Sequence, residues 1–152
     1  MSVTMKVTGL KELERELEKL SKAAGKGALR RGLTKAAQPL AEKMRAGAPV
    51  GDGELRDSIA VSGKLSPRQR RLHRKTVRDD KASVELFVGA GPLPQAHLEE
   101  FGSLHNAPRP FARPAWDSDQ EAMLDRLKTE LGAEISKSVS RAQARAAKAA
   151  RG

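Results

Sequence analysis

Residues 124–139, LDRLKTELGAEISKSV, contain the most regular apolar pattern in the chain. The larger apolar side chains recur every three or four positions, at Leu124, Leu127, Leu131, Ile135 and Val139. This spacing places them on one face of a helix. Because alanines continue the same register to position 149, we predict one helix from about Ala115 onward, about 45 to 55 Å long at 1.5 Å per residue. Other elements must cover its apolar face.

Two more helices are predicted near the N-terminus. The first carries a leucine stripe, Leu10, Leu13, Leu17 and Leu20, and is expected to end near Ala24 and Gly25. The second carries Leu29, Leu33, Ala36, Ala37, Leu40 and Met44. Pro39 inside it predicts either a bend or the tolerated loss of one hydrogen bond, and Pro49 predicts its end.

Alternating apolar residues predict short strands. Val3, Met5 and Val7 form one such run, and residues 51–53 are expected to form a turn. Two further runs, residues 58–62 and residues 83–89, are expected to pair as an antiparallel sheet. The predicted fold class is therefore α+β: a small antiparallel sheet packed with two N-terminal helices and one long C-terminal helix.

The composition predicts a thin core. The chain has 152 residues, and 23 of them are Ala. Leu, Ile, Val and Phe together number 30, which is about 20% of the chain and borders on the range of disordered proteins. We therefore expect one domain, over residues 1–135, that gains stability by burial against copies of itself or other subunits.

Several classes of protein are excluded or disfavoured by the same composition. The chain has no Cys, which excludes disulfide scaffolds, thiol catalysis and Cys-ligated metal sites. It contains no apolar run of the roughly 18 residues that a membrane span needs, and no signal-peptide block. We expect a soluble protein with no membrane partner.

Positive charge is concentrated in two segments. The formal net charge is +10, from 29 Lys and Arg against 19 Asp and Glu. Residues 64–81 are predicted to be an exposed basic linker, and residues 136–152 a basic helical tail that frays or docks on a neighbour. The candidate contacts to DNA or to an acidic partner are Arg68, Arg70, Arg71, Arg74, Lys75, Arg78, Arg141, Arg145 and Lys148.

These basic residues leave three interpretations open: weak non-specific DNA contact, an acidic protein partner, or a solvated surface. The chain has no Tyr and only four aromatic residues, Phe87, Phe101, Phe111 and Trp116. That number is too small for a base-stacking platform, so sequence-specific recognition of nucleic acid is disfavoured.

No catalytic or metal site is predicted. His97 and His105 are eight residues apart, which does not match the i, i+4 spacing of a helical zinc site. Asp117, Asp119 and Glu121 are acids at a predicted helix start, where the helix dipole favours them without any metal. Nucleophile elbows and phosphate-binding glycine loops are also missing from the sequence. We expect a non-enzymatic protein without cofactors.

Three segments in order resemble a known family. The first runs from Gly9-Leu10 through Ala48-Pro49-Val50 to Gly53-Glu54-Leu55-Arg56-Asp57-Ser58-Ile59; the second is Ala96-His97-Leu98-Glu99-Glu100-Phe101-Gly102; the third is Pro108-Arg109-Pro110-Phe111-Ala112-Arg113-Pro114-Ala115. Together they resemble the tail-completion or head-tail joining proteins of long-tailed phages and prophages, over about residues 9 to 130. The chain departs from that family at Asp52, where Thr is common, and at Gln95, where an aromatic is common.

The resemblance implies a structural protein of the virion neck or upper tail, assembled in the host cytoplasm. It implies a homo-oligomeric ring around the DNA path, expected to be a hexamer. The implied partners are a head connector or stopper protein and a tail terminator or tail tube protein. The same role in the neck of a gene transfer agent is included. The alternatives are a tail terminator that caps the tail tube and, from another class, a small basic non-specific nucleic-acid-binding protein.

The matching motifs also supply candidates for subunit contacts, namely Leu55, Arg56, Glu100, Phe101, Arg109, Phe111 and Arg113. We expect Phe101, Phe111 and Trp116 to be core residues, with the two phenylalanines holding the proline-rich segment against the sheet. Gly102 is expected to provide a left-handed cap. For Arg109 and Arg113, contact across a subunit boundary and simple solvation remain equally possible.

Overall fold

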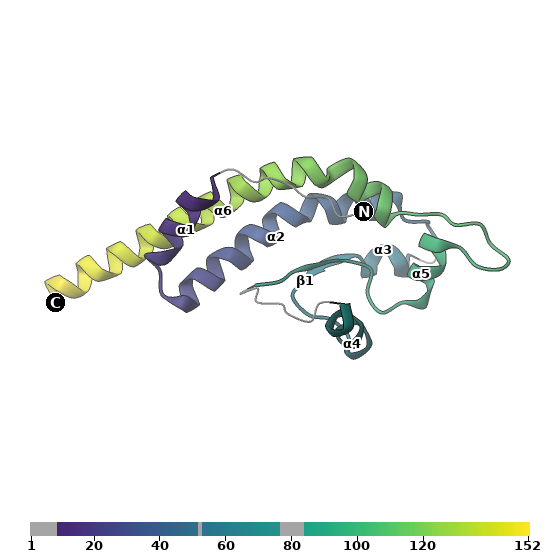
Figure 1. The fold of residues 1–152 in the computed structure, drawn as a ribbon, viewed down its shortest axis with the longest axis horizontal. Helices are drawn as coiled ribbons and strands as arrows, with labels where there is room; N and C mark the ends of the chain where they lie inside the picture. The colour runs from purple at the N-terminus through teal and green to yellow at the C-terminus, as the bar shows by residue number, and fades with distance from the viewer. Residues whose placement is uncertain (1–8, 52, 77–83) are drawn as a thin grey trace.

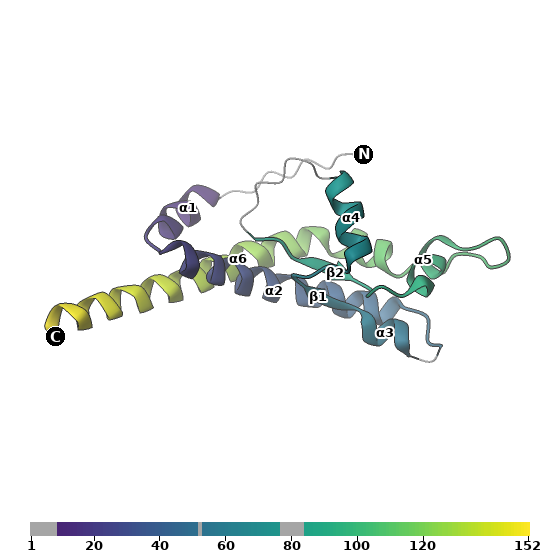
Figure 2. The ribbon, with the colours of Figure 1, turned by 90° about the horizontal axis from the view of Figure 1, so that it is seen from below.

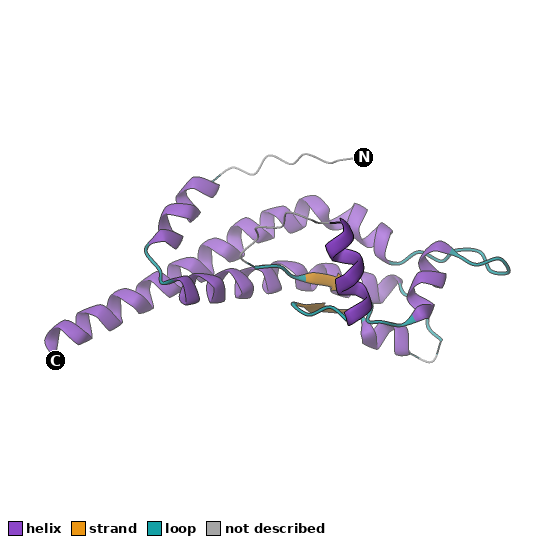
Figure 3. Cartoon of the chain, turned by 60° about the horizontal axis from the view of Figure 1, so that its bottom comes forward, coloured by secondary structure: helices purple, strands orange, loops and turns teal. Residues whose placement is uncertain are grey.

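The computed structural model describes residues 9–51, 53–76 and 84–152. Its elements in chain order are α1 (Leu10–Glu18), α2 (Lys22–Gly47), α3 (Glu54–Ser58), β1 (Ala60–Ser62), α4 (Pro67–Thr76), β2 (Phe87–Gly89), α5 (Pro94–Phe101) and α6 (Ala112–Arg151). The predicted α+β class is confirmed, with a small antiparallel sheet beside long helices (Figure 1). Figure 3 shows how small the strand part is.

Helices α2 and α6 lie side by side and form the long axis of the molecule (Figure 1). Helix α6 has 40 residues, so it is about 60 Å long at 1.5 Å per residue, and its C-terminal end extends past α2. It begins at Ala112 rather than at the expected Ala115, because Pro114 in the first helical turn needs no hydrogen-bonded N–H. Pro39 lies inside α2, which continues through it, so its lost hydrogen bond is tolerated.

The core is divided into two clusters along this helix pair. One cluster joins the C-terminal half of α2 to α3 and to the start of α6; it contains Leu40, Ala41, Met44, Ala48, Leu55, Ile59, Phe111 and Ala115. The other contains Ala28, Ile135 and Val139, with Leu13 and Leu17 of α1 packed against it. Among the residues that the structure describes, only small groups of larger side chains are buried, in agreement with the predicted thin core.

The two strands pair antiparallel, as predicted, but each is shorter than its apolar run. Val61 pairs with Val88, between the pairs Ala60 with Gly89 and Ser62 with Phe87. Ser58 belongs to α3 instead of the strand, and its hydroxyl donates to the carbonyl of Leu55 over 2.7 Å. The burial of Leu55 in the first core cluster explains why this segment turns as a helix.

The first helix ends earlier than predicted. Helix α1 ends at Glu18, and α2 begins at Lys22, so Gly25 lies within α2. The Ser21 hydroxyl accepts a hydrogen bond from the N–H of Ala24 over 3.3 Å, which is an N-cap. This serine is the signal that separates the two helices. The predicted strand over residues 3–7 and Asp52 of the predicted turn lie outside the described residues.

The basic segment 64–81, which was predicted to be an exposed linker, contains a helix. Helix α4 begins with Pro67 and lies across the strands on the side away from α2 and α6 (Figures 1 and 2). Ser66 and Gln69 cap it reciprocally, each side chain bonded to the other's backbone N–H, over 3.0 and 3.3 Å. This capping box with proline at the first position explains why so charged a segment is helical.

Candidate assembly surfaces

A buried carboxylate joins the first half of α6 to α2. Asp119 is 1% exposed and receives hydrogen bonds from Arg126 on its own helix, the shorter over 2.5 Å, and from Lys43 of α2 over 2.9 Å. The Arg126 bond lowers the pKa of Asp119 and outweighs burial, with Lys43 adding to the effect. Asp119 therefore stays charged and fixes how α6 faces α2.

A second carboxylate, that of Glu134, forms a similar link between α6 and α2 beside the second core cluster. Glu134 accepts hydrogen bonds from Lys35 over 2.5 Å and from Arg31 over 2.9 Å, both from α2. These two bonds, that of Lys35 first, lower the pKa of Glu134 from 4.5 to about 2. Arg31 also donates to the Ser138 hydroxyl over 3.0 Å. Both carboxylates therefore join α6 to α2 through ion pairs.

Helix α5 supplies the cap of α6. The Glu100 carboxylate accepts three backbone hydrogen bonds, from Phe111 over 2.8 Å and from Ala112 and Arg113 over 2.9 Å each. Burial raises the pKa of Glu100, but the three N–H groups together outweigh it and lower the pKa overall. The N-terminus of α6 is thus held by a residue eleven positions earlier in the chain.

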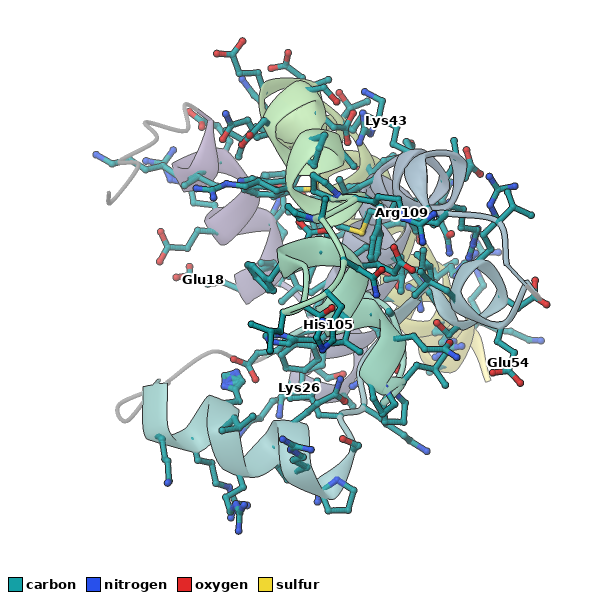
Figure 4. The ribbon with its side chains drawn as sticks, turned by 90° about the vertical axis from the view of Figure 1, so that its right-hand side faces the viewer. Glu18, Lys26, Lys43, Glu54, His105 and Arg109 are labelled. Atoms are coloured by element: carbon teal, nitrogen blue, oxygen red, sulfur yellow. The ribbon has the colours of Figure 1, made fainter. Side chains whose placement is uncertain are left out.

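The segment between α5 and α6 forms a loop that projects from one end of the molecule (Figure 1). Glu99 closes its base with a bidentate pair to Arg109, at 2.8 and 2.9 Å, and its carbonyl accepts from the Arg109 N–H over 2.7 Å. Gly102 has φ of 79°, and a Cβ there would lie 3.0 Å from Pro108 and from the Asn106 carbonyl. Leu104 in the loop is 93% exposed. Figure 4 views this end, with His105 and Arg109 labelled.

An apolar groove of about 710 Å³ opens between the helix pair and the sheet. Its lining includes Leu33, Leu40, Leu86, Val88, Phe101 and Trp116. Phe101 is 68% exposed and Trp116 is 40% exposed. Exposed apolar surface of this kind is typical of proteins that contact other proteins.

Helix α4 presents a one-sided basic surface. Its five cations, Arg68, Arg70, Arg71, Arg74 and Lys75, fall within an arc of about 160° at 3.6 residues per turn. On the opposite side, His73 contacts the Phe87 ring edge-on at 5.3 Å and lies 3.6 Å from the Glu85 carboxylate. The helix therefore contacts the segment of β2 through His73, and its five cations are exposed.

A comparison with protein-family models matches residues 11–102 of this chain. The matching family carries the description "Bacteriophage HK97-gp10, putative tail-component". The matched stretch is more than half of the chain. The chain belongs to the HK97-gp10-like family.

The stretch matched to the HK97-gp10-like family runs from α1 to Gly102, so it includes α2, both strands and α5, and it ends before α6. The family description agrees with the resemblance to phage tail proteins that the sequence motifs indicate. Neither the comparison with curated proteins nor the comparison with solved structures found a match. No helix among the described residues is long and apolar enough to cross a membrane.

The predicted subunit contacts of this HK97-gp10-like chain occupy two kinds of position. Leu55 and Phe111 are buried in its own core, at 6% and 4% exposed. Glu100 caps α6, and Arg56 donates to the Ala48 carbonyl over 3.1 Å. Phe101, Arg109 and Arg113 are exposed and remain candidates for contact with a neighbour.

The expectation that three aromatics form the core is wrong for two of them. Phe111 is buried, whereas Phe101 and Trp116 line the groove and are exposed. Phe101 is the last residue of α5, where its ring contacts His97 at 4.9 Å, and both exposed rings line the open groove instead of the buried cluster.

The predicted basic contacts fall in two separate places. Five lie on α4, and Arg141, Arg145 and Lys148 lie exposed on the projecting end of α6. Arg78 lies outside the described residues. The structure does not bring the two groups together within one chain, since they sit on different elements at different distances along the long axis (Figure 1).

Two structural residues were not identified from sequence. Asp119 was considered only as an acid at a helix start, yet it is a buried ion-pair partner. Glu134 gave no local signal, because its partners lie 99 and 103 residues away. Among the described residues no group of three metal-ligating side chains occurs.

Proposed function

We propose that this chain is a non-enzymatic structural protein of the phage or prophage neck, which completes the tail and joins it to the head connector. The family match over residues 11–102 carries this proposal, because it identifies a tail component. The proposal includes a location in the virion at the head-tail junction, with assembly in the host cytoplasm.

The proposed working form is a homo-oligomeric ring, with six subunits, around the DNA path. The thin core, the open apolar groove and the projecting end of α6 support it, because a single chain leaves these surfaces uncovered. The faces of the ring would bind a connector or stopper protein on one side and a terminator or tube protein on the other. Binding, not catalysis, would be the mechanism.

Imaging of assembled particles tests the location. We expect the subunit at the junction between head and tail, and a position along the tube or at the tail tip would overturn the proposal. Deletion of the gene distinguishes the proposed role of tail completion from the related role of tail terminator. A completion protein should leave tails of normal length that fail to join heads, whereas loss of a terminator should give overlong tails.

A nucleic-acid-binding protein is the second candidate, favoured by the one-sided basic surface of α4. Binding to phosphate backbones releases counterions, so it weakens steeply with salt. Tight binding to free DNA with a steep salt slope would support this candidate. Weak binding with a shallow slope would support the structural role instead.

A further inference from the structure

Helix α6 carries two exposed stripes of opposite charge. The acidic stripe is Asp117, Glu121 and Asp125, spaced i, i+4, i+8 in the first half of the helix. The basic stripe is Arg141, Arg145 and Lys148, spaced i, i+4, i+7 in the projecting half. None of these six side chains forms an ion pair with another described residue.

The two stripes match in register. Arg141 follows Asp117 by 24 residues, Arg145 follows Glu121 by 24, and Lys148 follows Asp125 by 23. At 1.5 Å per residue, this offset is about 36 Å along the helix. Because both stripes belong to one continuous helix, they cannot meet within a chain, and any pairing between them must join two molecules.

The faces of the stripes determine how two molecules could pair. At about 100° per residue, the centres of the two stripes lie roughly 150° apart or more around the helix. In a two-fold dimer of antiparallel α6 helices, the acidic stripe of each copy would have to meet the basic stripe of the other at one interface. Both stripes would then have to lie on the same face of α6, which they do not, so a two-fold dimer is disfavoured. A head-to-tail contact uses opposite faces for two different neighbours, and it forms a ring when the rotation between neighbours closes the circle.

We propose that the basic stripe of one copy docks against the acidic stripe of the next copy, head to tail around the assembly. This inference rests on the proposed ring and names the surface that forms it. The contact is exposed and polar, so it is salt-sensitive and weak in one pair of molecules. Repetition around a closed ring would make it effective.

Charge reversal tests the pairing. One variant carries Asp117→Lys, Glu121→Lys and Asp125→Lys, and the other carries Arg141→Glu, Arg145→Glu and Lys148→Glu. In sedimentation at low ionic strength, each variant alone should associate at least tenfold more weakly than the original chain. A mixture of the two should recover association, because each reversed stripe then meets an opposite one. No recovery in two folded variants overturns the pairing.

Cross-linking tests the head-to-tail direction. Because the chain has no Cys of its own, only the introduced cysteines can react. The test variant carries Glu121→Cys and Arg145→Cys. It is treated with a bis-maleimide that spans about 8–10 Å, the distance between packed helices. We expect a ladder of cross-linked oligomers that extends beyond the dimer. The matched control replaces Arg145→Cys by Gln143→Cys, which lies on the other side of the tail and should give no ladder. A product that stops at dimer, or an absent ladder in concentrated protein, overturns the proposal.

These outcomes are separate from those that test the proposed function. If the chain is found at the head-tail junction but gives no cross-linked ladder, the stripe contact is wrong and the proposed function stands. If the chain gives the ladder but is absent from the particle, the contact stands and the proposed function is wrong.

Discussion

At the scale of single residues, Glu100 of α5 caps the N-terminus of a different helix, α6. Its carboxylate binds three N–H groups at the start of α6. We expect Glu100→Ala to lower the free energy of unfolding by about 1–2 kcal/mol, because these donors lose their partner. For a chain of this size the melting temperature should fall by about 2–8 °C, measured by circular dichroism.

The neighbouring residue provides the control for this prediction. Glu99→Ala removes a carboxylate from the same helix, but it breaks a pair whose arginine is 67% exposed, so about 0.5 kcal/mol or less should be lost. Equal losses in the two variants would contradict the capping role of Glu100.

Glu134 predicts a pH dependence of stability. Its pKa in the folded chain is lowered from 4.5 to about 2 by Lys35 and Arg31. The carboxylate therefore stabilises the fold above pH 4.5, and this contribution is lost as the pH falls toward 2. In urea unfolding, the stability difference between the original chain and Glu134→Gln should shrink across this range.

A carboxylate on the exposed face of α1 serves for comparison. Glu14→Gln also removes one carboxylate, but Glu14 has no ion pair among the described residues. Its stability should differ from that of the original chain by no more than about 0.5 kcal/mol, because no ion pair is lost. A stability difference for Glu134→Gln that does not change between pH 4.5 and pH 2 would contradict the assigned cause.

At the scale of elements, the close approach of α2 and α6 depends on Gly32. A Cβ at this position would lie 2.8 Å from the Leu131 side chain and 3.1 Å from its Cα, which cannot swing away. We expect Gly32→Ala to destabilise the fold by about 1–3 kcal/mol, although alanine is the better helix former by up to about 1 kcal/mol. Chemical denaturation measures this loss.

Gly25 on the same helix is the matched control. Its nearest neighbour for a Cβ is the Leu17 side chain at 3.7 Å, an ordinary contact. Gly25→Ala should therefore leave stability unchanged or raise it by up to about 1 kcal/mol. If Gly32→Ala also stabilised the chain, the helices would not pack as closely as described.

Sequence patterns predicted the elements with long apolar stripes more accurately than the short ones. Helices α2 and α6 were predicted from periodicity, since burial of a continuous stripe requires regular spacing. Helix α4 has no such stripe, and the high positive charge of its sequence predicted a linker although a capping box is present. Helix α3 is held by Leu55 in the core, so its five residues carry no period of their own.

At the scale of the whole molecule, the end of α6 is separable from the folded body. Residues 144–152 are exposed, and the last buried residue before them is Val139. Deletion of residues 144–152 should change the free energy of unfolding by no more than about 0.5 kcal/mol. Self-association at low ionic strength should weaken, because two of the three basic-stripe residues are removed; analytical ultracentrifugation measures it.

Salt provides the companion measurement for this deletion. At 1 M salt, where screening acts within about 3 Å, the full-length chain should sediment like the deletion variant. A deletion variant that associates as strongly as the full-length chain at low salt would show that the tail is not used for assembly.

The amino-acid sequence by itself determined the fold class, the long C-terminal helix, the antiparallel pairing and the family. These follow from local spacing and from motifs, which depend only on neighbours along the chain. The tertiary structure decided the roles of particular side chains. It placed Glu100 on the N-terminus of α6, buried Asp119 between Lys43 and Arg126, and left Phe101 on the rim of the groove. Each of these depends on residues that are distant in sequence and meet only after α2 and α6 have packed.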